Sequence, residues 1–525
     1  MDIRRNMNGS GRGGDTGTPP GHVRHGGVRL VPGPWSLFPV ALLLLLPAHA
    51  RWSPVAVPPA QQLPRIVLDG AFEDWMGVPL AYGDPRDARD TASVDFGRLW
   101  ITQDEDYLLL RLEVGVELSL QSRNAVTLYL DTDDDPATGL AVRGIGADLA
   151  WTFGRRRGRL FTGGDTVAVT HADVGLITAP TVTSAEFEIA FARDAEPIPG
   201  VRLFPGRTIR LSLAVASPGG GDILPDPPIG IPYTFVDVTP PALPAVALRK
   251  AAAGHLRVLS YNTNNRLFDP ERAESYRRIV TAIAPDLVLW QEVRDHGSED
   301  VLAYVGDWLA APPGGWHHAS AGGEATVLLS PFPIARVDSL GGSAAFLLDV
   351  DPASGSQLLL VGLSVPCCDQ DVERQHELDL IVAFLRDARA PGGVLTLEPN
   401  TPIALVGDAN LVGLARQRRT LLEGDIADEA QFGPDAPPDW DGSALTDLIP
   451  RHTHRPTTFT WYGTDFSPGR LDYVIYTDAV LDVGNRFVLY TPELPEPVLA
   501  RWGLERNDTD VATDHLPVVA DFVLP

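Results

Sequence analysis

Polar residues of types that do chemistry stand at five places in the second half of this sequence, each beside an apolar run. Asn262 closes "LRVLSYN" and Glu292 follows "DLVLWQ". The other three places hold Asp408 with Asn410 in "ALVGDANLVG", Asp472 in "RLDYVIY", and Asp514 with His515 in "TDHLPVV". Carboxylate, amide and imidazole groups can hold a polar ligand and move protons. One such place alone is typical of a turn or a helix cap, but five in one region indicate a shared site.

The elements that must position these residues read as strands joined by helices. The run before Asn262 predicts a strand, and apolar residues at helical spacing predict a helix from about Glu271 to Ile283. Pro285 ends that helix, and "DLVLWQEV" predicts the next strand. Strand ends are where α/β folds assemble polar sites. We therefore expect Asn262 and Glu292 at the ends of neighbouring strands.

The first half of the chain has a different pattern. From about Ile66 to Val238, short runs such as "DYLLLRLEV" and "TIRLSLAVAS" alternate apolar and polar residues between Gly, Pro and Asp turns. Residues 65–238 are predicted to form an all-β sandwich. Residues 239–254 are rich in Pro and Ala and are predicted to be a linker. Because such a linker has little core to share, we expect the two halves to fold separately.

The formal net charge of the chain is -26. This excess disfavours non-specific binding to nucleic acid or to anionic membranes, because basic groups dominate such binding. Residues 255–525 contain no lysine, so a broad basic groove for duplex DNA is not expected. The local basic run from Arg416 to Arg419 is either a ligand-facing patch or the solvated face of a helix.

The two cysteines of the chain, Cys367 and Cys368, are adjacent. Neighbouring cysteines can pair only in a strained ring, so no framework of disulfides is expected. The sequence also has no spaced set of cysteines and histidines that would indicate a structural zinc site.

Residues 1–50 have the pattern of a signal peptide and leader. The apolar run "SLFPVALLLLLPAHA" ends in Ala48-His49-Ala50, the small-x-small pattern of a secretory cleavage site. We expect the mature protein to begin near Arg51 and to be secreted or periplasmic. The run is short for a membrane span, and an uncleaved anchor is the alternative.

The stretches "IVLDGAFEDW", "DFGRLWITQDEDYLLLRLEV" and "VTLYLDTDDDPATG" together resemble the family-9-like carbohydrate-binding modules. This resemblance implies a β-sandwich, often with a structural Ca²⁺, and a glycan as a partner. Asp131, Asp133 and Asp135, with Asp134 between them, offer the hard oxygen ligands that Ca²⁺ prefers. The alternative is an acidic turn between strands.

The same half contains three tryptophans that could contact a glycan: Trp75, Trp100 and Trp151. They either form a platform on which sugars stack or lie in the core, where large aromatic residues are common.

In the second half, "LSYNT", "PDLVLWQEV", "GDAN", "RLDYVIY" and "TDHLPV", in this order and at these separations, resemble the endonuclease/exonuclease/phosphatase superfamily. The resemblance covers residues 255–525. It implies an α/β fold of four layers, in which two mixed sheets face each other with helices outside. It also implies a metal-dependent phosphoesterase site at one end of the sheets.

By this resemblance, Glu292 would hold Mg²⁺, for which Mn²⁺ could substitute. Asn262 and Asp514 would lie near the ion or complete its site through water. Carboxylate and amide oxygens with several retained waters are the surroundings that Mg²⁺ favours.

The resemblance also implies catalytic roles. Asp408 would align or deprotonate the attacking water, and Asn410 would orient that water or contact the phosphate. His515 would stabilise the pentacovalent centre, and Asp472 behind it would fix the ring and favour its protonated form.

One position departs from the family pattern. Where the family usually has a His after its middle strand, "LLLVGLSVPCC" places Ser364. Serine can donate one hydrogen bond but cannot carry positive charge. This departure predicts reduced activity or a substrate with a better leaving group.

Taken together, these residues predict an exported Mg²⁺-dependent phosphoesterase of nuclease or phosphatase type with an accessory β-sandwich. Its substrate would be a nucleic acid, an inositol phosphate or a phospholipid head group, and no protein partner is inferred. One alternative is a catalytically weakened protein that binds glycans through its first half. The other is a secreted lipid phosphodiesterase, for which "TFTWYGTDFSPG" is the candidate membrane-facing loop.

Overall fold

The structure is a computed structural model that describes residues 63–87, 93–216, 221–293, 295–322 and 326–525. The predicted leader, residues 1–50, lies outside the described residues. Residues 59–525 make up one compact unit. No helix in the described ranges is both long enough and apolar enough to span a bilayer.

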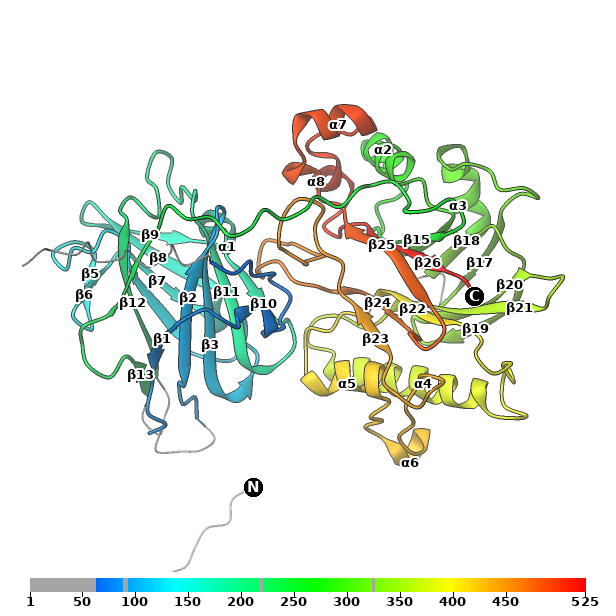
Figure 1. The fold of residues 1–525 in the computed structure, drawn as a ribbon, viewed down its shortest axis with the longest axis horizontal. Helices are drawn as coiled ribbons and strands as arrows, with labels where there is room; N and C mark the ends of the chain where they lie inside the picture. Colours follow the sequence, from blue (N-terminus) through cyan, green and yellow to red (C-terminus); the bar gives the residue numbers. More distant parts are fainter. Residues whose placement is uncertain (1–62, 88–92, 217–220, 294, 323–325) are drawn as a thin grey trace, which may run out of the picture. The chain divides into compact units, whose positions relative to one another are not determined.

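The first half of the unit is built from two main sheets (Figure 1). The five-stranded sheet has the order β1 (Leu80–Gly83), β2 (Arg98–Gln103), β3 (Tyr107–Leu118), β11 (Ser184–Ala192) and β10 (Ile177–Ala179). The seven-stranded sheet has the order β13 (Asp222–Leu224), β12 (Thr208–Val215), β4 (Thr127–Asp131), β7 (Leu149–Thr152), β8 (Arg157–Thr162) and β9 (Asp165–Val169), with β14 (Ile231–Thr234) paired to β12. The minor elements are the hairpin β5 (Leu140–Val142) and β6 (Ile145–Ala147), helix α1 (His171–Val174), and the 3-10 turns Glu73–Trp75 and Phe153–Arg155.

Alternation along the strands forms the core between these sheets. Leu108, Leu110 and Leu112 point from one face of β3 into the same buried cluster as Leu128 and Leu130 of β4. Residues two apart on a strand share a face, so each sheet buries one face against the other. The strands predicted for this half are therefore confirmed.

The three tryptophans considered for sugar stacking are in the core instead. Trp75 and Trp151 are buried, and the ring of Trp100 is covered by the guanidinium groups of Arg98 and Arg111. The prediction of a sugar-stacking platform is wrong, because these side chains supply apolar area that the sandwich buries.

The second half contains two six-stranded mixed sheets (Figure 1). The first has the order β17 (His317–Ala321), β18 (Thr326–Ser330), β16 (Leu287–Gln291), β15 (Leu256–Asn262), β26 (Val518–Val523) and β25 (Asp482–Val488). The second has the order β19 (Ile334–Leu340), β20 (Ser343–Asp351), β21 (Ser356–Ser364), β22 (Ile403–Asp408), β24 (Asp472–Tyr476) and β23 (Thr446–Leu448). Strands β15 and β16 run parallel, as do β21 and β22.

The helices of this half are α2 (Ala273–Ile283), α3 (Ser298–Val305), α4 (Asp371–Arg389), α5 (Ala415–Glu423), α6 (Glu429–Phe432), α7 (Glu496–Trp502) and α8 (Asp508–Ala512), with 3-10 turns at Gly306–Trp308 and Thr491–Glu493. Helix α2 buries Tyr276, Ile279 and Ile283, which recur at helical spacing, and it ends at Ala284 in the left-handed region. It lies where the sequence predicted a helix. The prediction of a sheet-rich second half with helices is confirmed.

The predicted linker, residues 239–254, contains no helix or strand. It nevertheless packs on the second half: Leu248 is buried, the amide of Val246 donates to the carbonyl oxygen of Thr453 at 2.9 Å, and Lys250 pairs with Asp286 at 2.6 Å.

The two halves also share core, contrary to our expectation. Leu68 and Trp75 belong to the same buried cluster as Leu448 and Phe459. The amide of Leu68 donates to the carbonyl oxygen of Pro456 at 2.8 Å. The expectation of little shared core considered only residues 239–254, whereas the contacts come from the strands and loops on either side. Separate folding of the two halves stays a prediction.

Candidate active site

Strand ends bring the predicted residues to one place. Asn262 is the last residue of β15 and is paired with Gln291, so Glu292 follows directly at the end of the neighbouring parallel strand. In the other sheet, Asp408 ends β22 and is paired with both Asp472 of β24 and Ser364 of β21.

The backbone at these ends has conformations that few residues adopt. Glu292 and Asn410 have positive φ angles of 52° and 46°, which cost free energy and are concentrated at functional sites. Gly407 has a φ of 141°, and a Cβ atom there would lie 2.3 Å from the carbonyl oxygen of Leu363. Glycine is therefore required immediately before Asp408.

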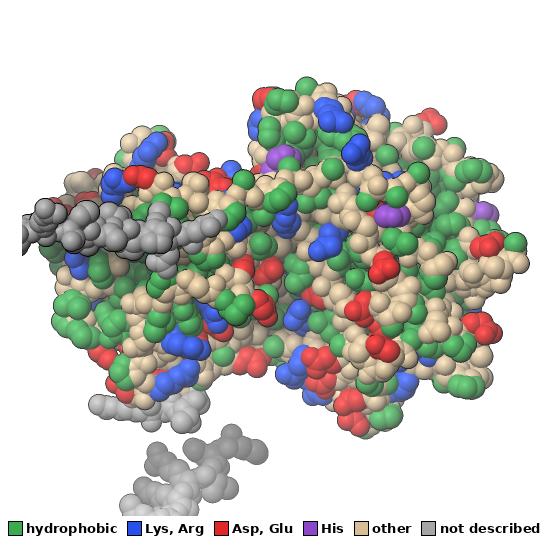
Figure 2. Space-filling model, in the orientation of Figure 1, with side chains coloured by type: hydrophobic (Ala, Val, Ile, Leu, Met, Phe, Trp, Pro, Cys, Tyr) green, Lys and Arg blue, Asp and Glu red, His purple; other side chains and the backbone are tan. Residues whose placement is uncertain are grey.

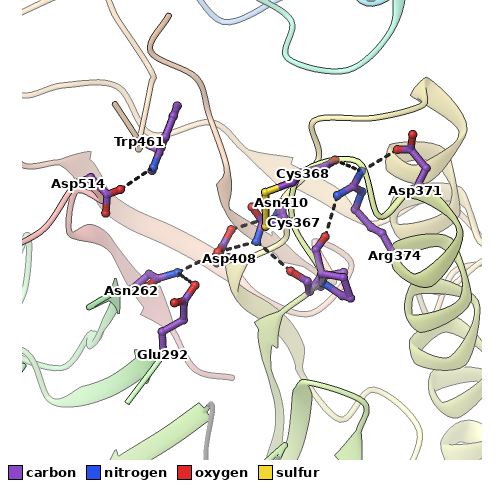
Figure 3. The surroundings of a disulfide bond; sticks show 12 residues. Asn262, Glu292, Cys367, Cys368, Asp371, Arg374, Asp408, Asn410, Trp461 and Asp514 are labelled. Carbon is purple, nitrogen blue, oxygen red and sulfur yellow. Dashed lines mark hydrogen bonds and ion pairs between the residues drawn. A yellow bond between two sulfur atoms is a disulfide. The ribbon is translucent and has the colours of Figure 1, made fainter. Parts of the chain in front are cut away.

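Asn262 joins the two sheets within the site. Its Nδ2 donates to Asp408 Oδ2 at 2.9 Å and to Glu292 Oε1 at 3.1 Å (Figure 3). Asn410 holds the other side of Asp408, because its amide nitrogen donates to Oδ1 at 3.1 Å and its Nδ2 to Oδ2 at 2.8 Å. These contacts fix one carboxylate by two amides from different sheets.

His515 forms an ion pair with Asp472. Nδ1 of the ring lies 2.9 Å from Asp472 Oδ2, and both side chains are buried. Burial alone would lower the pKa of His515, but Asp472, with Asp408 and Asp514, outweighs it and raises the pKa to about 10. The ring is therefore an imidazolium at neutral pH, with Nδ1 held and Nε2 left to donate.

The pKa of Asp408 differs from that of an exposed aspartate. Burial raises its pKa to about 8, and the positive charge of His515 opposes this rise. The raised pKa makes the ionised carboxylate of Asp408 a stronger proton acceptor than an exposed aspartate, which is the property that a general base needs.

Asp514 lies at the same edge with partners of its own. Its Oδ1 accepts from Asn264 Nδ2 at 3.0 Å and its Oδ2 from Trp461 Nε1 at 3.1 Å. Asn264 and Trp461 were not among the predicted site residues. The second asparagine of "YNTNN" and the aromatic loop "TFTWYG" were the signals that could have indicated them.

Ser364 lies beside the site because it is paired in register with Asp408. The loop after Ser364 is hydrogen-bonded to Asp408 and Asn410. The amide of Val365 donates to the carbonyl oxygen of Asp408 at 3.0 Å, and Asn410 Nδ2 donates to the carbonyl oxygen of Val365 at 2.8 Å. Two residues further on, Cys367 and Cys368 form an exposed disulfide beside the site (Figure 3).

Two kinds of group could hold a metal here. Asp408, Asp472 and His515 have ligand atoms within 4.8 Å of one another, but an imidazolium that is paired with a carboxylate is not a ligand. The half-buried Glu292, with Asp514 across the site, supplies hard oxygen atoms that suit Mg²⁺. The residues present therefore fit the predicted ion at Glu292 better than at the His515 pair.

In the predicted Ca²⁺ loop of the first half, the acidic side chains that lie together are not the three that the sequence predicted. Asp131 and Asp133 lie together with Asp148, within 4.8 Å, whereas Asp135 directs Oδ1 to the amide of Ala137 at 2.9 Å. Asp134 pairs with Arg210 at 2.5 Å. Asp148 was missed because it comes from β6–β7, outside the acidic run.

Comparison with known proteins gives one family. Residues 259–515 match the model of the Endonuclease/Exonuclease/phosphatase family. No curated protein matches the sequence.

Among solved structures, the chain is similar to a truncated TDP2 from Caenorhabditis elegans, with 16% identity over 51% of this chain and 97% of that one and a TM-score of 0.33. It is also similar to ANGEL2, described as a 2',3'-cyclic phosphatase, with 15% identity over 51% and 95% and a TM-score of 0.35. Sphingomyelinase C from Streptomyces griseocarneus has 19% identity over 51% and 99% and a TM-score of 0.29.

The family match covers the segment that carries Asn262, Glu292, Asp408, Asp472 and His515. It supports an endonuclease/exonuclease/phosphatase domain in the C-terminal half of the chain, and with it a hydrolase that acts on phosphoric esters.

Proposed function

We propose that this protein is an exported, Mg²⁺-dependent phosphoesterase that cleaves phosphodiester or phosphomonoester bonds by in-line attack of water. The observation that carries the proposal is the meeting of the His515–Asp472 pair with the doubly held Asp408 at the ends of two facing sheets. Phosphoryl transfer needs positioned groups around the nucleophile and donors for the charge that develops on the phosphoryl oxygens.

The residues divide this work between them. Asp408 accepts a proton from the attacking water, and Asn410 and Asn262 keep its carboxylate in place. His515 donates from Nε2 to a non-bridging oxygen, while Asp472 holds the ring. Mg²⁺ at Glu292, with Asn262 and Asp514 beside it, would supply positive charge to the phosphate.

The charge of the molecule bears on the substrate. On the face drawn in Figure 2, acidic and basic side chains are interspersed, and the described residues of that face form no continuous basic surface. Arg416, Arg418 and Arg419 are each engaged with Asp425 or Asp447. These arginines fit the solvated face of α5, so we favour a small or single-stranded phosphoester over duplex DNA.

A substrate panel tests the proposal. Plasmid DNA, RNA, inositol phosphates, sphingomyelin and a chromogenic phosphodiester are incubated with the purified protein in Mg²⁺, in Mn²⁺ and in EDTA. We expect cleavage of at least one substrate, lost in EDTA and in His515→Ala. Absence of cleavage across the panel would leave the glycan-binding alternative.

The Mg²⁺ site has its own test on the same substrate. Glu292→Gln removes a charged oxygen donor, so half-maximal activity should need at least about tenfold more Mg²⁺. An unchanged Mg²⁺ requirement would place the ion elsewhere.

N-terminal sequencing of the protein outside the cytoplasm should find a start near Arg51, and an intact apolar run in membranes would overturn export.

A further inference from the structure

Residues 460–469 form a short hairpin beside the active site, here called the aromatic hairpin. Trp461 and Gly469 pair at its base, where the amide of each donates to the carbonyl oxygen of the other at 3.0 Å. Trp461 also pairs with His515 in an antiparallel bridge. The base of the hairpin is therefore joined through the backbone to the segment that carries the catalytic pair.

The base of the aromatic hairpin also contacts two carboxylate residues of the site. Trp461 Nε1 donates to Asp514 Oδ2 at 3.1 Å (Figure 3), and the amide of Tyr462 donates to the carbonyl oxygen of Asp514 at 3.1 Å. Thr460 Oγ1 accepts from the amide of Asp472 at 2.9 Å. The position of the hairpin therefore helps to set where Asp514 and Asp472 lie.

The N-terminal sandwich holds the tip of the hairpin. The amide of Ser467 donates to Gln121 Oε1 at 2.8 Å, and Ser467 Oγ lies 3.0 Å from Thr178 Oγ1. Gln121 Nε2 in turn donates to Thr178 Oγ1 at 3.2 Å. Ser467 and Thr178 are both buried, so loss of these bonds would leave polar groups without partners.

Two arginines of the sandwich extend this contact. The guanidinium group of Arg156 lies over the ring of Phe466, 4.0 Å from its centroid, and donates to the main-chain oxygen of Gln121 at 2.8 Å. Arg157 pairs with Asp465 at 3.4 Å, and both of these side chains are exposed. Because exposed pairs contribute little, we assign the hold on the tip to the contacts in which Gln121 and Arg156 take part.

The sandwich also reaches the base of the hairpin. Gly469 cannot carry a side chain, because a Cβ atom there would lie 2.6 Å from Cγ2 of Thr181. The hairpin therefore packs against the sandwich at its tip and at its base, while Trp461 contacts the active site.

We propose that the N-terminal sandwich is a positioning module for the active site, in which Gln121 and Thr178 act through the aromatic hairpin to hold Trp461 against Asp514. The inference rests on the proposed phosphoesterase function. A hairpin fixed only at its base would move as surface loops do, and a displacement of about 1 Å within a site can lower turnover by up to about 10²-fold. Gln121 and Thr178 are positioning residues, since they act on the site through Ser467.

The test compares two glutamines of the sandwich in the full chain, on a substrate that the wild type cleaves. Gln121→Leu removes the acceptor for the amide of Ser467 and should lower kcat about tenfold, with a smaller change in KM. Gln121→Glu keeps an acceptor and should retain kcat. Gln103→Leu is the matched control, because the side chain of Gln103 bonds Val236 and Tyr233 within the sandwich. It should lower the melting temperature without lowering kcat.

A double-mutant cycle with Trp461→Phe shows whether Gln121 acts through the hairpin. Gln121→Leu should change kcat by less than about twofold in the Trp461→Phe background, whereas independent effects would multiply. Effects that multiply, or an equal loss of kcat in Gln103→Leu, would overturn the proposal.

A spectroscopic measurement needs no substrate, so it separates failure of this inference from failure of the proposed function. In protein that is isotope-labelled at the tryptophan indole nitrogens, the resonance of Trp461 is assigned by its loss in Trp461→Phe. This resonance should shift in Gln121→Leu and stay in place in Gln121→Glu and Gln103→Leu. An unmoved resonance in Gln121→Leu would contradict the proposal. Should Gln121→Leu fail to fold, Thr178→Val, which keeps the shape of the side chain, must shift the resonance instead.

Discussion

At the scale of single residues, the imidazolium of His515 is the group on which the proposed chemistry depends most. It is buried, its Nδ1 lies 2.9 Å from Asp472 Oδ2, and Asp472, Asp408 and Asp514 favour its positive charge. A donor fixed in this way loses little free energy to reorganisation when negative charge develops nearby.

Replacing His515 should therefore cost turnover and not metal affinity. We expect His515→Ala to lower kcat by about 10²–10³-fold, the typical effect of removing one positioned donor. Asp472→Asn should lower kcat less, because the ring stays but is held loosely. Initial rates over a range of Mg²⁺ concentrations measure both, and a shifted Mg²⁺ requirement in His515→Ala would contradict this division of roles.

Ser364 allows the opposite kind of test. It is paired in register with Asp408 at the end of β21 and is half-buried. If the family histidine is what this site lacks, Ser364→His should raise kcat on a substrate that the wild type cleaves. Ser364→Ala serves as the control for the change in packing. Unchanged or slower turnover in Ser364→His would mean that serine is suited to the substrate.

The residues of the site could be predicted from sequence because each stands at the end of an apolar run, and strand ends meet at a sheet edge. Asn264 and Trp461 were missed because their segments, "YNTNN" and "TFTWYG", read as loops, and only the folded structure brings both side chains to Asp514.

At the scale of elements, the connection from β21 to α4 links the site to a buried arginine. Arg374 of α4 is fully buried and donates to the carbonyl oxygens of Pro366 at 2.7 Å and Cys368 at 3.2 Å. The other end of the connection is held by Asn410 through Val365. The Cys367–Cys368 disulfide lies between these two anchors, on the exposed side.

Reduction of this disulfide should therefore loosen Asn410. We expect treatment with a phosphine reductant, which does not chelate Mg²⁺ strongly, to lower kcat by up to about 10²-fold, the effect of moving a positioned group by about 1 Å. The double variant Cys367→Ser, Cys368→Ser should have the lower kcat with or without reductant. Thiol counting confirms the redox state, and full activity with two free thiols would refute the link.

The sequence argument treated these cysteines only as evidence against a disulfide framework. Their place beside the site depends on where β21 ends relative to β22. That register is set by pairing between strands far apart in the sequence, so the local pattern does not reveal it.

At the scale of the whole molecule, the sandwich supports loops that carry site residues. Thr181 Oγ1 donates to the carbonyl oxygen of Leu411 at 2.8 Å, and the amide of Thr183 donates to the carbonyl oxygen of Gly413 at 2.8 Å. Both acceptors follow Asn410 closely. The first half of the chain therefore braces the loop after β22, in addition to any binding role of its own.

This support should be measurable as a contribution to stability. Thr181→Val removes one part-buried hydrogen bond without changing shape, and we expect it to lower the free energy of unfolding by about 1 kcal/mol. Thr166→Val, at an exposed residue of β9, is the control. Denaturant unfolding of both variants decides the point, and equal effects would mean that the contact contributes nothing.

Strand β26 lies between β15 and the edge strand β25, and Asp521 within it pairs with the buried Arg257 of β15 at 2.6 Å. Strand β15 opens the domain in sequence and β26 follows His515. During synthesis on the ribosome, β15 therefore cannot pair with β26 until some 250 further residues have been added. Such non-local pairing is slow to form. The nascent chain cannot form the His515–Asp472 pair before residue 515 has been added, and it cannot complete the sheet before residue 523. A ribosome that stalls or terminates before Asp514 would release a chain that contains Glu292, Asp408 and Asp472 but exposes an open sheet edge, a substrate for chaperones and proteases rather than a partly active enzyme.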